Sequence, residues 1–143
     1  NGEEEVKMKG GYLTLGYPKI LTDTDRQSFM KESLVGWYKG HALKRLTEKS
    51  KRYEKILRVT PRSISLKNYK SRWGSCSNSG EINFNWKIII APHHIVDYVV
   101  VHELCHMLEH NHSPKYWRHV QSVIPDYKMD RQWLKVNGMG LFI

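Results

Sequence analysis

An apolar stretch from Ile95 to Leu108 constrains the fold of this 143-residue chain more than any other feature. Its apolar side chains recur on almost every side of a helix, which is typical of a buried helix rather than a surface helix. Proline is tolerated in the first turn of a helix, so we expect this helix to run from Pro92 to His110.

The flanking segments predict the elements that surround the buried helix. We expect Asp23 or Thr24 to cap a long helical pattern that ends before Thr60–Pro61 and can bend at Gly36 and Gly40. Residues 1–22 read as short strands or loosely held chain. We expect strands at residues 63–69, 72–77 and 81–90, and C-terminal helices at residues 113–124 and 126–136. A long N-terminal helix, a small antiparallel sheet and then helices make an α+β fold.

Length and composition limit the class of protein. A chain of 143 residues has room for one domain, so we expect residues 1–143 to form a single domain. No apolar run approaches the roughly 18 residues of a membrane span, which excludes a transmembrane protein.

Cys76 and Cys105 cannot form a disulfide scaffold, which favours a reducing compartment and hence the cytoplasm. The chain starts at Asn1 without a Met, and we expect it to be truncated at the N-terminus.

The net charge of +9 is concentrated in one basic stripe, from Lys39 to Arg72. This stripe contains twelve Lys and Arg residues, while Glu48 and Glu54 are its two acidic residues. Such a stripe can be a site of weak nucleic-acid or nucleotide binding. We favour a solvated helix face followed by a polar strand face, since no base-reading motif accompanies the stripe.

The buried helix contains the sequence His102-Glu103-Leu104-Cys105-His106. Side chains four residues apart lie on one helix face, so the two imidazoles can bind one Zn²⁺ ion. Glu103 then stands beside the metal, where a general base for a zinc-bound water is needed. Two histidines and a glutamate in an apolar helix are costly without a partner, and a cation is a suitable one.

A catalytic zinc ion usually has a third protein ligand, and Glu109, His110 and His112 are the candidates. On an unbroken helix, Glu109 and His110 lie about 10–12 Å beyond His102 along the axis, which is too far for easy convergence. His112 follows the expected helix end, where Asn111 can turn the chain back by adopting a left-handed conformation. We therefore expect His112 as the third ligand, with Glu109 next.

Several short motifs occur in a specific order: SRWGSCS at residues 71–77, INFNW at 82–86, AP at 91–92, DYVVVHELCH at 97–106, NHS at 111–113 and YW at 116–117. Over roughly residues 62–136 the chain thereby resembles the YgjP-like metallopeptidase family, predicted metal-dependent hydrolases related to SprT-like and other zincin proteins. The resemblance implies a zincin-like fold and one zinc ion bound by His102, His106 and His112. It also implies Glu103 as the catalytic acid/base and a peptide or protein substrate.

In zincins an extended peptide lies beside an edge strand, so the resemblance suggests a substrate shelf at Gly74 and Ser75. A developing oxyanion needs a further donor, for which Tyr116, His119 and Arg72 are candidates. We therefore expect Gly74, Ser75 and Tyr116 to contact the substrate. Trp73 and Trp86 are interpreted as packing residues of the same hairpin.

Two other functions remain open. A metal-dependent nucleotide pyrophosphatase or phosphohydrolase activity has also been attributed to the family, and the basic stripe favours it. Such chemistry commonly uses several carboxylates, whereas only Glu103 and Glu109 lie near the motif. A nucleic-acid-associated domain with a structural metal is the third option, but structural zinc usually has cysteine ligands.

Overall fold

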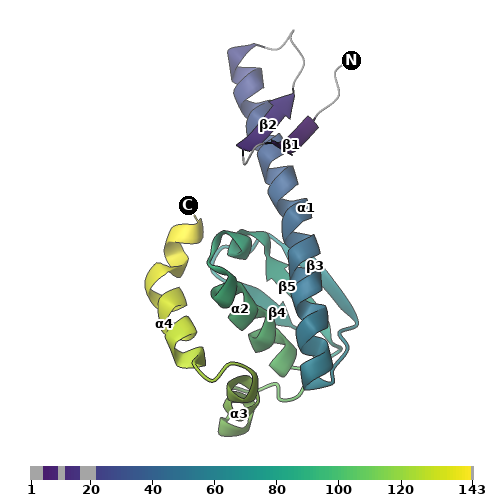
Figure 1. The fold of residues 1–143 in the computed structure, drawn as a ribbon, viewed down its shortest axis with the longest axis vertical. Coiled ribbons are helices and arrows are strands. Elements are labelled where there is room, and N and C mark those ends of the chain that lie inside the picture. Colours follow the sequence, from purple (N-terminus) through teal and green to yellow (C-terminus); the bar gives the residue numbers. More distant parts are fainter. Residues whose placement is uncertain (1–4, 10–11, 17–21, 143) are drawn as a thin grey trace. The chain divides into compact units, whose positions relative to one another are not determined.

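The computed structural model describes residues 5–9, 12–16 and 22–142 (Figure 1). The chain divides into two compact units, residues 1–41 and 42–143. In the first unit, β1 (Glu5–Lys9) and β2 (Tyr12–Gly16) pair antiparallel, with Val6 opposite Leu15. Strands were among the structures expected for residues 1–22, and the rest of residues 1–21 lies outside the described part. The single domain over residues 1–143 stays a prediction.

Helix α1 (Asp23–Leu57) begins in the first unit and ends in the second. The side chain of Thr22 caps it, because Thr22 Oγ1 accepts a hydrogen bond from the Asp25 backbone N–H at 3.2 Å. The helix ends at Arg58, whose φ of 58° is left-handed. The Val59 N–H then donates to Glu54 O at 3.2 Å, as in a Schellman ending without glycine. The predicted long helix is confirmed, with its cap one residue earlier.

The second unit contains a three-stranded sheet in the order β3-β5-β4. Strands β4 (Gly74–Cys76) and β5 (Glu81–Asn85) pair antiparallel across a tight turn, whereas β3 (Ser63–Lys67) pairs parallel with β5. The expectation of a purely antiparallel sheet was therefore wrong. After β3 the chain crosses to the opposite edge of the sheet and forms β4, which runs antiparallel to β5. Strand β3 lies on the other side of β5 and runs in the same direction as β5.

Asn85 ends β5 and holds the crossover. Its buried amide donates to Tyr69 O at 3.1 Å and to Arg72 O at 3.2 Å, both in the segment that joins β3 to β4. Its Oδ1 accepts from the Lys87 N–H and caps the 3₁₀ helix η1 (Trp86–Ile90). The predicted strand over residues 81–90 was thus too long, because an asparagine cap converts its second half into a 3₁₀ helix.

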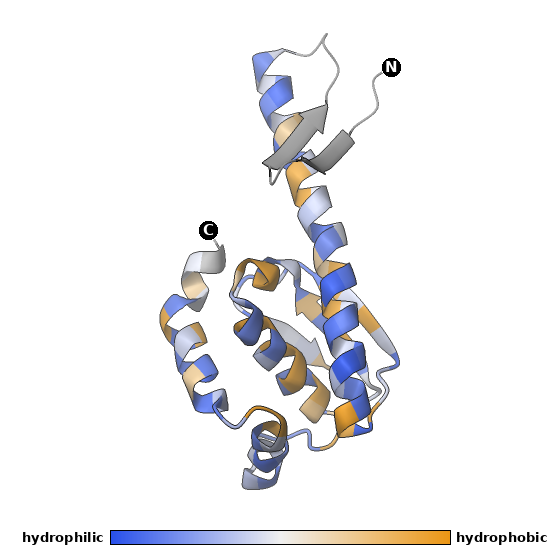
Figure 2. Cartoon of the chain, in the orientation of Figure 1, coloured by the Kyte–Doolittle hydropathy of each residue, from blue (hydrophilic) through white to orange (hydrophobic). Residues whose placement is uncertain are grey.

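Helix α2 (His93–Cys105) is the centre of the second unit and packs against β4, η1, α3 and α4. Most of its side chains are buried, as predicted, and Figure 2 shows apolar residues on its successive turns. The helix ends earlier than the predicted His110. The N–H groups of His106, Met107 and Leu108 bond to carbonyls three residues back, beginning with His106 N to Glu103 O at 3.1 Å, so the chain tightens and leaves the helix.

The C-terminal helices are α3 (Pro114–Val123) and α4 (Tyr127–Asn137), followed by the 3₁₀ helix η2 (Gly138–Phe142). Ser113 caps α3 by accepting from the Tyr116 N–H at 3.3 Å, and Pro114 occupies the first turn. These elements confirm the predicted α+β class with a long N-terminal helix and C-terminal helices. Within the described residues, no helix has the length and apolar character needed to cross a membrane.

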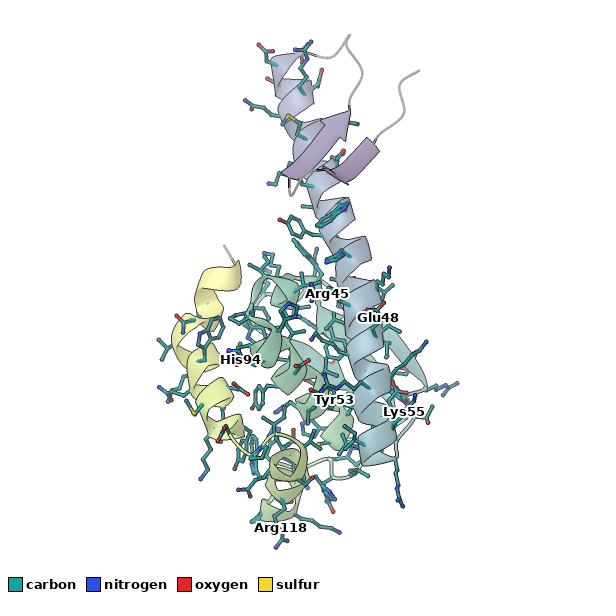
Figure 3. The ribbon with its side chains drawn as sticks, in the orientation of Figure 1. Arg45, Glu48, Tyr53, Lys55, His94 and Arg118 are labelled. Carbon is teal, nitrogen blue, oxygen red and sulfur yellow. The ribbon has the colours of Figure 1, made fainter. Side chains whose placement is uncertain are left out.

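Two cations of the basic stripe hold α1 on α2. Arg45, labelled in Figure 3, bonds the His93 ring at 2.8 Å, and Lys49 Nζ pairs with Asp97 Oδ1 at 2.7 Å. Other stripe residues are exposed on α1 and on the segment after it: Lys44, Lys51, Arg52, Lys55, Arg58, Arg62, Lys67, Lys70 and Arg72. The stripe thus combines packing contacts with a solvated face.

Candidate metal centre

Three imidazoles converge at the end of α2. His102 and His106 lie one helical turn apart, and His112 comes from the loop between α2 and α3. One nitrogen of each ring lies within 4.8 Å of the others, and the Nε2 atoms of His106 and His112 are 3.0 Å apart. In the part of the chain that the structure describes, this is the one group of three or more such side chains close enough to share an ion.

The early end of α2 brings His112 back to the helix. The His106 Nδ1 atom bonds to Glu109 O at 3.2 Å, and the Ser113 N–H donates to Asn111 O at 2.8 Å. Asn111 does not adopt the expected left-handed conformation, since Arg58 is the one non-glycine residue with positive φ among those described. The carboxylate of Glu109 pairs with Lys115 at 3.0 Å, so Glu109 is outside the imidazole cluster.

The three side chains fit a metal ion. Burial, together with the neighbouring His106, His112 and Arg131, lowers the pKa of His102 to about 3. Burial and His112 also lower the pKa of His106. Neutral imidazoles are the form that ligates metals. The 3.0 Å between two nitrogens is close to the ~3.3 Å expected for ligands of a tetrahedral zinc ion. His102 Nδ1 is buried without a hydrogen-bond partner among the described residues.

Glu103 lies next to this cluster, with 5% of its surface exposed. Burial raises the pKa of its carboxyl group to about 8, and the nearby Arg72 cation acts in the opposite direction. Gly74 of β4 approaches it closely: a Cβ atom on Gly74 would lie 2.8 Å from Glu103 Oε2 and 3.1 Å from Asn83 O. Only glycine leaves space for the carboxylate at this point.

Tyr116 lies against the imidazoles but faces no solvent. It is fully buried, its hydroxyl donates to His102 O at 2.7 Å, and its ring stacks on His106 with centroids 4.5 Å apart. Ser75 is half-buried and its hydroxyl bonds to that of Tyr69 at 2.8 Å. Of the three expected substrate contacts, Gly74 lies against Glu103, whereas the polar groups of Ser75 and Tyr116 already have protein partners.

A cavity of about 200 Å³ opens beside His102 and Glu103. It connects β4 and α2 with α4, and its lining residues are Trp73, Gly74, Tyr98, Val99, His102, Glu103, Arg131 and Leu134. Sequence reasoning missed Tyr98, Arg131 and Leu134. Tyr98 is one helical turn before His102, a signal that could have been used, but nothing in the sequence links α4 to the motif.

Comparison with known protein families shows to which family this chain belongs. The pattern of the YgjP-like family, described as the YgjP-like metallopeptidase domain, matches residues 7–137. The chain belongs to the YgjP-like family. Its fold is also similar to the crystal structure of the metallopeptidase zymogen abylysin of Pyrococcus abyssi. That similarity has a TM-score of 0.56 and 22% identity, and covers 63% of this chain and 93% of the other. No curated protein matches.

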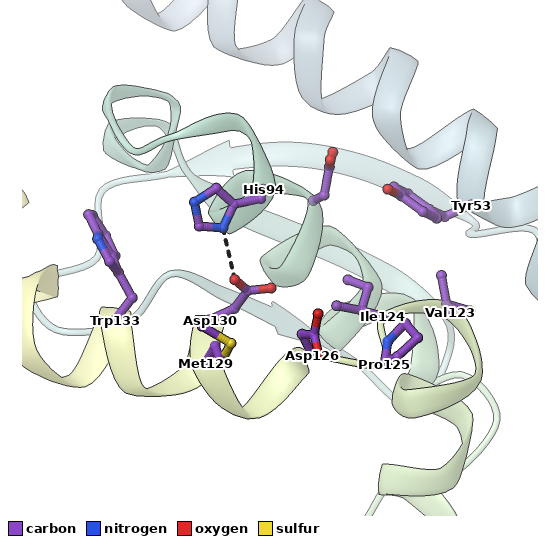
Figure 4. A pocket seen from close by; sticks show the side chains of 10 residues that line it. Tyr53, His94, Val123, Ile124, Pro125, Asp126, Met129, Asp130 and Trp133 are labelled. Carbon is purple, nitrogen blue, oxygen red and sulfur yellow. Dashed lines mark hydrogen bonds and ion pairs between the residues drawn. The ribbon is translucent and has the colours of Figure 1, made fainter.

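This YgjP-like chain has a second, larger cavity of about 520 Å³ between α1, the start of α2 and α4 (Figure 4). His94 Nδ1 pairs there with the buried Asp130 Oδ1 at 2.8 Å, and Tyr53, Asp97 and Trp133 also line it. No residue of the imidazole cluster lines this cavity. The His94–Asp130 contact joins α2 to α4, and the Lys49–Asp97 ion pair joins α2 to α1, which is a structural role.

Proposed function

We propose that this YgjP-like protein is a zinc-dependent peptidase with His102, His106 and His112 as zinc ligands and Glu103 as general base. The observation that carries the proposal is the convergence of three imidazole nitrogens within 4.8 Å beside a buried carboxylate that lines a cavity. The metallopeptidase family supports a metal-dependent peptidase, and a set of neutral nitrogen ligands favours zinc over magnesium or calcium.

A zinc ion held by these rings supplies Lewis acidity, which polarises a carbonyl group and lowers the pKa of a water molecule to about 7. The chain's own acid/base group is Glu103. In the mechanism that we propose, its carboxylate accepts the proton of the attacking water and then donates it to the leaving amine. Burial raises the pKa of this carboxyl group, which favours its protonated form between these two events. Close contact with Gly74 keeps the carboxylate beside His102.

The edge of the sheet is the surface that we propose for the peptide substrate. Strand β4 has β5 on one side, and no other described strand pairs with it. The backbone around Gly74 and Ser75 is therefore available to an extended peptide at the strand adjoining Glu103. Tyr116 supports the metal ligands in this proposal and does not contact substrate, because it is fully buried.

Nucleotide pyrophosphatase activity has less support. Within the described residues no cluster of carboxylates could hold a metal pair, and Glu109 is paired with Lys115. No contact among the described residues supports nucleic-acid binding by the basic stripe. Arg45 and Lys49 of this stripe bond to side chains of α2. Both cysteines are free thiols, in keeping with the reducing cytoplasm that we propose as the compartment.

The test compares the wild-type protein with Glu103→Gln. We expect the variant to retain one zinc ion per chain by mass spectrometry and to cleave casein at least about 100-fold more slowly, because only the proton acceptor is removed. The control is His110→Ala, which removes an exposed imidazole outside the cluster and leaves zinc content and cleavage unchanged. Equal casein cleavage by Glu103→Gln and wild type would refute the general-base assignment.

A further inference from the structure

Arg131 on α4 brings a cation to the cavity that contains Glu103. Its side chain is exposed, and its guanidinium carbon lies 4.8 Å from the centre of the Trp117 ring. Among the described residues, Arg131 forms no ion pair with a carboxylate. An arginine that lines a cavity and has only an aromatic contact keeps its N–H donors available to a ligand.

The aromatic contact holds the guanidinium in place. Trp117 is itself fixed, because its ring stacks with Tyr127 at 5.1 Å and with His112 at 5.6 Å between centroids. A guanidinium over an aromatic face directs its N–H groups outward in the plane of the group, where they can bind two oxygens at once. Little side-chain entropy is then lost when a ligand binds.

The cavity walls select the size and the polarity of the ligand. Trp73, Val99 and Leu134 provide apolar surface, and the volume of about 200 Å³ corresponds to roughly seven water molecules. Such a space fits one amino-acid side chain rather than a nucleotide. Glu103 is the other charged group, and it lies against Gly74 on β4, whereas Arg131 comes from α4. The cation is thus supplied from a different wall than the catalytic carboxylate.

We propose that this cavity is a subsite for a carboxylate group of the peptide substrate, bound through two parallel hydrogen bonds by Arg131. The carboxylate is that of an Asp or Glu side chain or of the peptide C-terminus, since both present the same two oxygens. The inference rests on the proposed function for the placement of this group beside the cleaved bond. Binding of the carboxylate itself needs only the cavity and the guanidinium.

The test measures binding to zinc-loaded Glu103→Gln protein, in which cleavage is disabled. Calorimetry compares N-acetyl-Leu-Glu-amide with N-acetyl-Leu-Gln-amide, and N-acetyl-Leu-Ala with its C-terminal amide. We expect the carboxylate member of at least one pair to bind roughly tenfold more tightly than its uncharged partner. The first pair reports a side-chain carboxylate and the second a C-terminal one.

Adding Arg131→Gln should reduce that preference to about twofold or less without changing the affinity of the uncharged peptide. Arg131→Lys should restore only part of it, because an ammonium group lacks the planar pair of donors. The matched control is Arg118→Gln on α3 (Figure 3), an exposed arginine that does not line the cavity and whose loss should leave the preference intact.

Absence of any carboxylate preference, or a preference that survives Arg131→Gln, overturns the subsite. Zinc content is measured on the same samples. A carboxylate preference in protein that binds no zinc would support the subsite and contradict the proposed zinc centre, so the two failures are distinguishable.

Discussion

The Tyr116 hydroxyl donates a 2.7 Å hydrogen bond to the backbone carbonyl oxygen of His102. In a continuing helix the His106 N–H would bond to this carbonyl, but it bonds to Glu103 O instead. The tyrosine takes the place of the missing helical donor and joins α3 to the end of α2. Its ring also contacts His112, with centroids 5.0 Å apart, so one buried side chain touches all three imidazoles.

Tyr116→Phe keeps the ring and removes this hydrogen bond. We expect the free energy of unfolding to fall by about 1–3 kcal/mol, because a buried carbonyl loses its donor. Zinc affinity should fall by roughly tenfold, since supporting groups orient the ligands. Chemical denaturation and competition with a zinc chelator measure the two effects. Tyr127→Phe is the control, since its ring stacks on Trp117 without touching the imidazoles. An unchanged zinc affinity in Tyr116→Phe would show that the hydroxyl does not position the ligands.

Gly74→Ala tests the contact between β4 and Glu103. The new methyl group would lie 2.8 Å from Glu103 Oε2, so the flexible carboxylate must move while the fold changes little. We expect stability within about 1 kcal/mol of wild type, unchanged zinc content and a loss of casein cleavage of about 100-fold. Gly40→Ala in α1 has open space around the added atom and should cleave normally. Wild-type cleavage by Gly74→Ala would mean that the close approach has no part in catalysis.

The buried Glu103 predicts a pH dependence of the metal-free protein. Its pKa is about 8 in the folded state against an ordinary value of 4.5, so the folded state binds the proton more tightly. This contribution to stability is present at low pH and is lost as the pH rises toward 8. Between pH 6.5 and 8 we expect the free energy of unfolding to fall by about 1–2 kcal/mol more in wild type than in Glu103→Gln. Urea denaturation in the presence of a chelator measures it, and parallel pH profiles for both proteins would contradict it.

The sequence predicted the features of the site that depend on residues close together in the chain, but not the contacts between distant segments. Four-residue spacing places His102 and His106 on one face of any helix, and a helix that ends before His112 lets the chain return. The contact of Gly74 with Glu103 depends on how β4 packs on α2, which no local pattern specifies. Arg131 reaches the cavity from a helix whose docking is equally non-local. The parallel pairing of β3 with β5 requires a crossover between β3 and β4, to which Asn85 bonds, and alternating hydrophobicity cannot show such a crossover.

The most direct measurement of the central claim is anomalous X-ray scattering at the zinc edge from crystals of the zinc-loaded protein. We predict one strong peak within about 2.0–2.1 Å of a nitrogen atom of each of His102, His106 and His112. The peak should be absent from crystals of His112→Ala grown at the same zinc concentration, because two imidazoles remain. A wild-type map without a peak at the three imidazoles, or a zinc site formed elsewhere in the chain, would contradict the account.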